Sequence, residues 1–280
     1  MANEFSLVRK YWDLGGPSLV AKALYSKAES IFGVHNSSDG EFRIELNRKP
    51  YTVSGDWSMG QWRQFERDVM MPEVTRPMRE HLSEGDIMID IGTARGDTTL
   101  YGHSLVGEQG LVYAIEPDVT QFKSLRENIE RNNLKSVEYY NMAVGHKEGK
   151  VAPKDVVGQT TEYFQSLIEE IDSINIITLD RFVDENESPD LVKIDVDGAE
   201  DAVLRGGSKN VLGEIPIILE IHSSELLKNR HEFLQYIFDF SNEIKYLAAQ
   251  GMAPSEHKYG ERLESPDDLS QDVEVNLLVQ

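Results

Sequence analysis

The sequence predicts an α/β protein whose central sheet is mostly parallel and carries helices on both faces. Residues 87–91 and 111–115 are short, mostly apolar runs bounded by turn residues, which is typical of strands buried on both faces, and a further central strand is predicted at 190–195. Segments with helical periodicity lie between these runs and supply the crossovers that parallel strands require. A chain of 280 residues is long enough for one large domain of this class and an appendage.

The first 70 residues are predicted to form an extension ahead of a main domain at 71–280. Apolar residues alternate with polar ones at 42–46 and 51–53, which predicts a small hairpin. Helices are expected at 7–13, 19–32, 57–71 and 73–82. This extension carries no recognisable chemistry, so a lid over a substrate and a packing or dimer element remain equally good interpretations.

The first apolar strand leads into Gly92-Thr-Ala-Arg-Gly96, and a helix is expected at 98–106. Glycines permit a sharp turn and a close approach of the backbone to a ligand, and the positive end of the following helix points to the same place. This pattern predicts a nucleotide-type pocket at the carboxyl end of the strand. The dinucleotide fingerprint would need glycine where the chain has Ala94 and Asp97, so NAD is disfavoured.

The second strand ends at Glu116-Pro117, about 20 residues beyond the glycine loop. A carboxylate at this point can accept hydrogen bonds from both ribose hydroxyls of an adenosine. Asp118 and Gln121 then have the spacing of a helix N-cap and its partner, which predicts a helix as far as Asn132.

A third strand is expected at 137–140, and a turn follows at 141–145. Ala143 in that turn is small enough for an adenine ring to lie against the backbone, although an ordinary turn is an equally good interpretation. A variable loop with a helical part at 161–171 is expected next, and then an added or edge strand at 174–179.

The run Pro189-Asp-Leu-Val-Lys-Ile-Asp-Val-Asp-Gly-Ala-Glu200 predicts a central strand that ends in acids before a helix at 199–206. Asp195 lies within the strand, where an unpaired carboxylate is costly, so we interpret it as a functional residue. Asp197 and Glu200 are spaced by three residues and fit a capping box, which is a structural role.

A further strand at 215–221 places Glu220 and His222 on the same face. With Asp195 they are expected at the carboxyl edge of the sheet, where His222 is a candidate general base. The same three residues could hold a divalent metal, but two carboxylates and one histidine are unspecific without geometry, and no metal is predicted. A helix at 225–240 and two strands, 244–247 and 273–279, should end the sheet with an antiparallel pair.

The composition is strongly acidic, with 28 Lys and Arg against 49 Asp and Glu, a net charge of −21 and a pI near 4.7. Such a surface disfavours nucleic acid and anionic membranes as partners, and it suggests a halophilic source. The chain has no cysteine, which excludes disulfides and thiolate chemistry. No apolar run is long enough to span a bilayer or follows a basic leader, so a cytoplasmic location without membrane insertion is expected.

Taken together, these motifs resemble the FkbM family of class I S-adenosylmethionine (SAM)-dependent methyltransferases over about residues 70–280. The resemblance is carried by Pro72-Glu-Val, Glu84–Gly96 with Thr99, Val112–Pro117, Arg126-Glu-Asn128, Thr178-Leu-Asp180 and, most specifically, Asp190–Glu200. The chain departs from the family pattern at Thr93-Ala94, where Ala-Asn is more usual, and at Asp197, where Glu is more usual. A side-chain contact to the cofactor could differ at these positions.

The resemblance implies a Rossmann-like seven-stranded sheet with an antiparallel last strand and transfer of a methyl group from SAM to a hydroxyl. It implies that Asp195 lies near the methionine end of SAM and the acceptor. The residues it places at the cofactor are Asp90, Gly92, Thr93, Gly96, Thr99, Glu116, Pro117, Ala143 and Asp195. The acceptor is expected to be a small molecule or glycan, and a homodimer is possible. Methylation of a carboxylate and a non-catalytic nucleotide-binding role are the alternatives.

Overall fold

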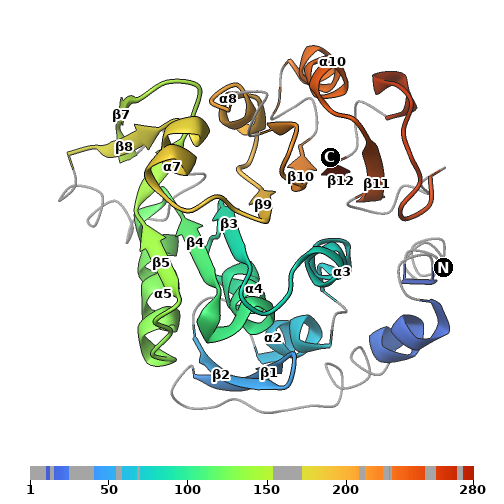
Figure 1. The fold of residues 1–280 in the computed structure, drawn as a ribbon. Helices are drawn as coiled ribbons and strands as arrows, with labels where there is room; N and C mark the ends of the chain where they lie inside the picture. The colour runs from blue at the N-terminus through green and yellow to red at the C-terminus, as the bar shows by residue number, and fades with distance from the viewer. Residues whose placement is uncertain are drawn as a thin grey trace.

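Figure 1 shows the fold in a computed structural model of the chain. The residues that the structure describes are 11–12, 16–24, 41–54, 59–67, 70–153, 172–207, 212–222, 227, 229–249, 257–269 and 274–280.

The described residues form a central seven-stranded sheet in the order β11-β12-β10-β9-β3-β4-β5. Its strands are β3 (Ile87–Ile91), β4 (Leu111–Ile115), β5 (Val137–Tyr140), β9 (Leu191–Ile194), β10 (Ile217–Ile221), β11 (Ile244–Ala249) and β12 (Val275–Val279). β12 runs antiparallel to both of its neighbours, and the other pairs between β10 and β5 are parallel. The predicted fold class is therefore confirmed, including the antiparallel last strand.

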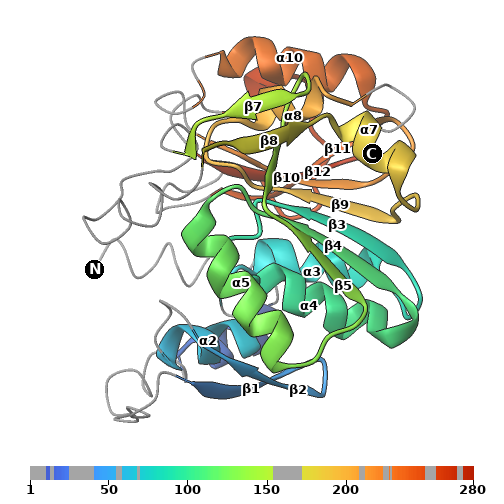
Figure 2. The same cartoon turned by 90° about the vertical axis from the view of Figure 1, so that its left-hand side faces the viewer.

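Helices cover both faces of this sheet, as Figure 2 shows. One face carries α3 (Pro72–His81), α4 (Asp97–Val106) and α5 (Val119–Arg131), and the other carries α7 (Leu179–Glu185), α8 (Glu200–Leu204) and α10 (Arg230–Phe240). Two 3-10 turns lie at Gly107–Gln109 and Pro266–Asp268, and α2 belongs to the extension described next. The sheet is thus the middle layer of a three-layer sandwich.

Strand alternation divides the core between the two faces. Met88 and Val112 pack into the cluster beneath α3, α4 and α5, while Ile89 and Tyr113 pack into the cluster beneath α7, α8 and α10. Successive side chains of a strand point to opposite faces, so runs that are apolar at every position suit a sheet covered on both sides.

The predicted hairpin is confirmed as β1 (Phe42–Leu46) and β2 (Lys49–Val53), which pair antiparallel. It packs with α2 (Met59–Glu66) outside α4 and α5 (Figure 2), and Val53, Trp62 and Phe65 share one buried cluster with Met88 of the central sheet. The division into units at residue 70 stays a prediction. Residues 11–12 and 16–24 are helical, and the rest of the helices expected at 7–13 and 19–32 lie outside the described residues.

Several expected elements differ from the structure. The turn expected at 141–145 contains β6 (Met142–Val144), which joins β8 (Ile174–Ile177) and β7 (Gly149–Val151) in a separate three-stranded sheet. The strand expected at 174–179 as an added or edge strand is an added one: it belongs to this small sheet, where it is the middle strand and not an edge. α7 was not expected, although Thr178 caps it by accepting a hydrogen bond from the Arg181 N–H. The helix expected at 161–171 lies outside the described residues.

Candidate active site at the carboxyl edge of the sheet

Asp90 connects the end of β3 to the start of α4. Its carboxylate is fully buried, and one oxygen accepts hydrogen bonds of 2.7 Å from the hydroxyls of both Thr98 and Thr99. Asp90 and Thr99 were both predicted to contact a cofactor. In this structure they hold the loop itself in shape, and a direct cofactor contact by either residue stays a prediction.

The two loop glycines are required by close packing of the protein. Gly92 has a φ of +76°, and a Cβ there would lie 1.7 Å from the carbonyl oxygen of Asp195. Gly96 has a φ of +92°, and a Cβ there would lie 2.5 Å from Cδ1 of Leu125. The missing Cβ atoms therefore face the end of β9 and α5. They let the loop pack tightly, and their expected contact with a cofactor stays a prediction.

Glu116 organises the loop from the neighbouring strand. Its two carboxylate oxygens accept hydrogen bonds of 2.8 Å from the backbone N–H groups of Ala94 and Asp118. Burial raises the pKa of Glu116 to about 7, even though both N–H groups favour the ionised form. Each oxygen of an ionised carboxylate has a second lone pair, so Glu116 can still accept hydroxyl groups from a ligand.

The neighbours of Glu116 hold this corner of the sheet together. The side-chain amide of Asn141 donates hydrogen bonds to the carbonyls of Glu116 and Pro117, and so ties the end of β4 to the end of β5. Thr93 is buried, and its N–H points at the carbonyl of Ile115 at 3.3 Å. The predicted cofactor contacts of Thr93 and Pro117 stay predictions.

Lys193 is a residue that the sequence reasoning missed. It lies in β9 with only 3% of its side chain exposed, and its ammonium nitrogen lies 3.4 Å from Asp90 and 3.5 Å from Asp195. It also donates a hydrogen bond of 2.9 Å to the carbonyl of Gly92. Burial alone would lower the pKa of Lys193, but the surrounding carboxylates raise it above its ordinary value. A lysine inside an apolar strand is a signal that could have revealed a buried partner.

The predicted gathering of Asp195, Glu220 and His222 is confirmed. One side-chain oxygen or nitrogen atom of each residue lies within 4.8 Å of those of the other two, at the point where β9 and β10 end. Glu220 and His222 are buried, and about a quarter of the Asp195 side chain is exposed. Burial, reinforced by the nearby Asp195 carboxylate, raises the pKa of Glu220 to about 8.

The capping-box prediction for Asp197 and Glu200 is wrong. Ala199 is the N-cap of α8 and makes no side-chain cap, whereas both acids turn to His222. Glu200 is fully buried with an oxygen 2.5 Å from Nδ1 of His222, and Asp197, at a φ of +48°, lies 3.3 Å from Nε2. Burial alone would lower the pKa of His222, but its bonds to Asp197 and Glu200 raise it to about 11.

This arrangement sets a condition on the predicted base. Both ring nitrogens of His222 face carboxylates, so the ring carries a proton on each while Asp197 stays in place. Asp197 has 94% of its side chain exposed and can move away without unpacking the core. The role of His222 as a base stays a prediction, and it requires that movement.

Other features of the surface are less informative about the site. Ala143 lies in β6 opposite Ile176 of β8, and its contact with an adenine ring stays a prediction.

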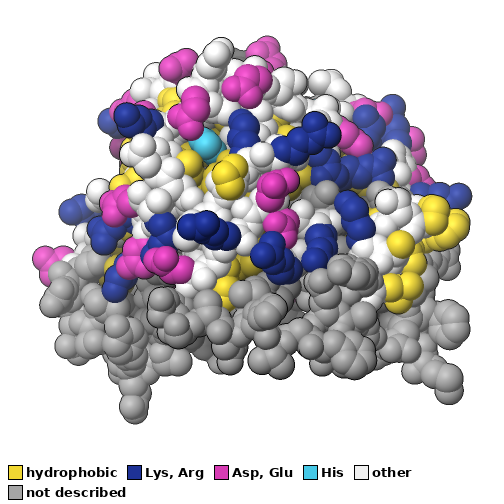
Figure 3. Space-filling model, turned by 90° about the horizontal axis from the view of Figure 1, so that it is seen from below, with side chains coloured by type: hydrophobic (Ala, Val, Ile, Leu, Met, Phe, Trp, Pro, Cys, Tyr) yellow, Lys and Arg dark blue, Asp and Glu magenta, His cyan; other side chains and the backbone are white. Residues whose placement is uncertain are grey.

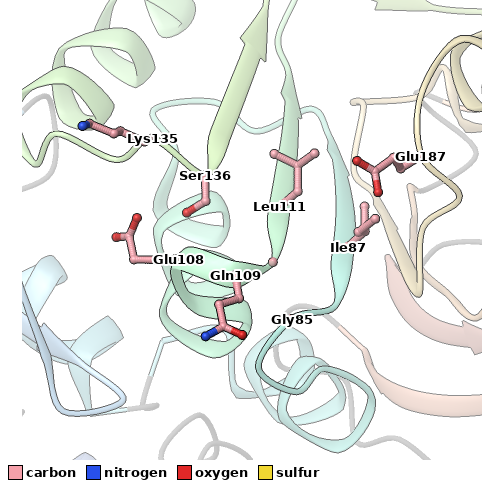
Figure 4. A pocket seen from close by; sticks show the side chains of 9 residues that line it. Gly85, Ile87, Glu108, Gln109, Leu111, Lys135, Ser136 and Glu187 are labelled. Carbon is pink, nitrogen blue, oxygen red and sulfur yellow. The ribbon is translucent and has the colours of Figure 1, made fainter.

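Figure 4 shows a hollow of about 290 Å³ between Ile87, Leu111, Ser136 and neighbouring residues. Ile87 and Leu111 begin β3 and β4, so this hollow lies at the amino edge of the sheet, opposite the predicted pocket.

Charge is unevenly distributed over the molecule. Figure 3 shows a face on which Lys and Arg side chains gather in spite of the net charge of −21. Net charge therefore does not describe every face, and the expected absence of a nucleic-acid partner stays a prediction. In the part of the chain that the structure describes, every helix is too short or too polar to cross a membrane.

A family model described as "Methyltransferase FkbM domain" matches residues 90–252, which is more than half of the chain. The chain belongs to the FkbM methyltransferase family. The match runs from Asp90 through β9, β10 and β11, so it contains both the glycine loop and the cluster around His222.

Two curated relatives are also methyltransferases by name. The hexuronic acid methyltransferase AglP of Haloferax volcanii is 26% identical over 155 residues, which cover 54% of this chain and 62% of the relative. A probable cobalt-precorrin-6B C(15)-methyltransferase of Sulfolobus acidocaldarius is 30% identical over 81 residues, which cover 27% of this chain and 42% of the relative. The chain thus spans less than two thirds of the length of each.

Among solved structures, a SAM-dependent O-methyltransferase of Thermotoga maritima aligns with a TM-score of 0.44 and 14% identity, covering 85% of this chain and 77% of that one. The M. jannaschii TYW2 structure in complex with AdoMet aligns with a TM-score of 0.43 and 14% identity, covering 88% of each chain.

Proposed function

We propose that this protein is a SAM-dependent O-methyltransferase that acts on a hydroxyl of a small molecule or glycan. The observation that carries this proposal is the cluster of Asp195, Glu220 and His222 beside the Gly92 loop, within a chain of the FkbM family. The name of one relative, a hexuronic acid methyltransferase, supports a sugar as the acceptor.

The donor groups at the glycine loop suit the adenosine part of SAM. The Glu116 carboxylate has lone pairs left for two ribose hydroxyls after it accepts the N–H groups of Ala94 and Asp118. Loop residues 92–96 bring backbone to the carboxyl ends of β3 and β4, which is where α/β sheets bind ligands. This pocket would be bordered by other residues predicted at the cofactor, which are Asp90, Gly92, Thr93, Gly96, Thr99, Pro117 and Ala143.

The acidic cluster suits the reacting end. SAM supplies a methyl group on a cationic sulfur, and its transfer breaks the S–C bond, forms the new O–C bond and leaves the electron pair on sulfur. Carboxylates such as Asp195 would stabilise the positive charge before transfer. The proton of the acceptor hydroxyl passes to this cluster, either to a carboxylate or to Nε2 of His222 once Asp197 has moved away.

Electrostatics favour a hydroxyl over a carboxylate as the acceptor. An anionic acceptor would enter beside the carboxylates of Asp195 and Asp197, and like charges a few ångströms apart repel each other. Methylation of a carboxylate stays the second candidate, because AglP is named for a hexuronic acid. A carboxylate needs no base, so His222→Ala would leave that reaction nearly unchanged.

Calorimetric titration tests cofactor binding, with SAM and NAD added separately to the unmodified chain, to Glu116→Ala and to a control, Glu138→Ala. Glu138 is an exposed acid on the neighbouring strand β5. We expect SAM to bind, NAD to fail, and only Glu116→Ala to weaken SAM. A SAM affinity that both variants retain would refute the ribose assignment.

Methyl transfer is then tested with SAM labelled in its methyl group, using a hexoside and the matching hexuronide as acceptors. Mild alkali releases methanol from a methyl ester and leaves a methyl ether intact, so it separates the two candidate reactions. We expect an alkali-stable product that His222→Ala reduces. An alkali-labile product that this variant leaves unchanged would establish the carboxylate reaction instead. SAM binding with no transfer to any acceptor would favour a non-catalytic role.

A further inference from the structure

The cluster at the ends of β9 and β10 combines three potential metal ligands. Asp195, Glu220 and His222 each offer one atom within 4.8 Å of the others. Two carboxylates and one imidazole form a mixed oxygen and nitrogen donor set, which suits Mn²⁺ or Zn²⁺ better than Ca²⁺. Because Glu220 and His222 are both buried, these two donors are already oriented by the surrounding protein.

A fourth residue, outside this set, orients the histidine. Glu200 of α8 is fully buried, and one of its oxygens lies 2.5 Å from Nδ1 of His222. The same oxygen accepts a hydrogen bond of 2.9 Å from the Gly198 N–H, so its position is fixed from two sides. A metal-binding histidine almost always donates its second ring N–H to a carboxylate or carbonyl in this way. Nε2 is then left as the ligand atom.

The charge around the ring also favours a cation. Four carboxyl groups meet at this corner, those of Asp195, Asp197, Glu200 and Glu220. The ammonium group of Lys193 lies between Asp195 and Asp90 and contacts both. Asp197 lies 3.3 Å from Nε2 and is exposed, so it can move aside or become a further ligand. A divalent cation at Nε2 would replace the proton that the ring carries there, and so bring one more positive charge to a corner rich in carboxyl groups.

We propose that Asp195, Glu220 and His222 bind one divalent transition-metal cation, and that Glu200 is a positioning residue for His222. The remaining coordination positions would go to water and to hydroxyl oxygens of the acceptor. That part of the proposal rests on the proposed methyl transfer, whereas metal binding itself does not. A bound cation lowers the pKa of a hydroxyl that it coordinates. The acceptor could then lose its proton even though both nitrogens of His222 are occupied and the ring cannot act as the base.

The test is to titrate the metal-free full chain with Mn²⁺ and, separately, with Zn²⁺. Binding of Mn²⁺ is measured by the loss of the electron paramagnetic resonance signal of the free ion, and binding of Zn²⁺ is measured by calorimetry. High ionic strength suppresses diffuse binding to the acidic surface. We expect one saturable site. Glu220→Gln and His222→Ala should each weaken it at least about tenfold, and Glu200→Gln by about 10–100-fold. Glu148→Gln, which alters an exposed pair with Arg181, should leave it unchanged.

Circular dichroism checks that each variant folds. If the substitutions at buried positions unfold the chain, the metal affinity of Asp195→Asn is measured instead, because a change to this partly exposed side chain should leave the fold intact. The proposal is overturned if the unmodified chain shows no saturable site, or if the folded ligand variants bind as tightly as Glu148→Gln. SAM titration of the same samples separates the two conclusions: SAM binding without a metal site would overturn only this inference, and a metal site without SAM binding would overturn only the methyltransferase.

Discussion

Replacing Lys193 with Met should destabilise the protein far more than its ion-pair distances suggest. The ammonium group lies 3.4 Å from Asp90 and 3.5 Å from Asp195, and Asp90 is fully buried. Removing one partner of a buried pair leaves an uncompensated charge and costs about 3–5 kcal/mol. For a chain of this length that corresponds to a fall in Tm of about 6–10 °C, at about 2 °C for each kcal/mol.

Lys245→Met is the matched control, because Lys245 also lies in a strand of the central sheet. Its ammonium nitrogen is only 2.7 Å from Glu243, but a third of each side chain is exposed. Removing such an exposed pair should cost about 0–1 kcal/mol, since water screens it. Burial, and not distance, therefore decides which lysine matters.

Denaturant unfolding and calorimetry measure both variants, and a double-mutant cycle with Asp90→Asn measures the coupling. Asp90→Asn removes the charge that Lys193→Met leaves behind, so the double variant should be more stable than the sum of the two losses, by about 0.5–3 kcal/mol. The reasoning is refuted if Lys193→Met costs no more than Lys245→Met, or if the two losses simply add.

Two further predictions concern the glycine loop. Gly92→Ala should cost about 2–5 kcal/mol, because the positive φ and the close contact with the Asp195 carbonyl both oppose a Cβ. Gly85→Ala, where the φ is also positive but nothing lies within 4 Å, should cost only about 1–2 kcal/mol; equal losses in denaturant unfolding would contradict this explanation. Because burial raises the pKa of Glu116 to about 7, its carboxylate is ionised, and accepts ribose hydroxyls best, above that pH. SAM affinity should therefore be about tenfold weaker near pH 6 than near pH 8, and a calorimetric profile that Glu116→Gln leaves unchanged would show that another group is responsible.

The central strands could be predicted because their signals are local. β4 is a continuous apolar run between turn residues, and β3 is apolar except for Asp90. Asp118 forms the predicted cap by accepting hydrogen bonds from the N–H groups of Thr120 and Gln121. The three-residue strand β6 has no such signal. It exists because it pairs with β8, about 30 residues further along, and short strands depend on such partners.

The gathering of Asp195, Glu220 and His222 was predictable, whereas the contacts of their neighbours were not. Alternation within β10 and the shared carboxyl edge were enough to bring Glu220 and His222 to Asp195. The partner of Lys193 lies about 100 residues earlier in the chain, so local spacing cannot reveal it. Asp197 and Glu200 satisfied a local capping pattern, but His222 offers both acids a charged partner, and that tertiary contact overrides the local preference.

A crystal structure of the chain with S-adenosylhomocysteine, the product of methyl transfer, tests the central claim most directly. The account predicts that the adenosine occupies the pocket formed by residues 92–96 and 116. Both ribose hydroxyls should lie within about 2.6–3.2 Å of the Glu116 carboxylate, and the sulfur should point toward Asp195. An adenosine bound elsewhere, or a Glu116 carboxylate that contacts only the N–H groups of Ala94 and Asp118 in the complex, would contradict it.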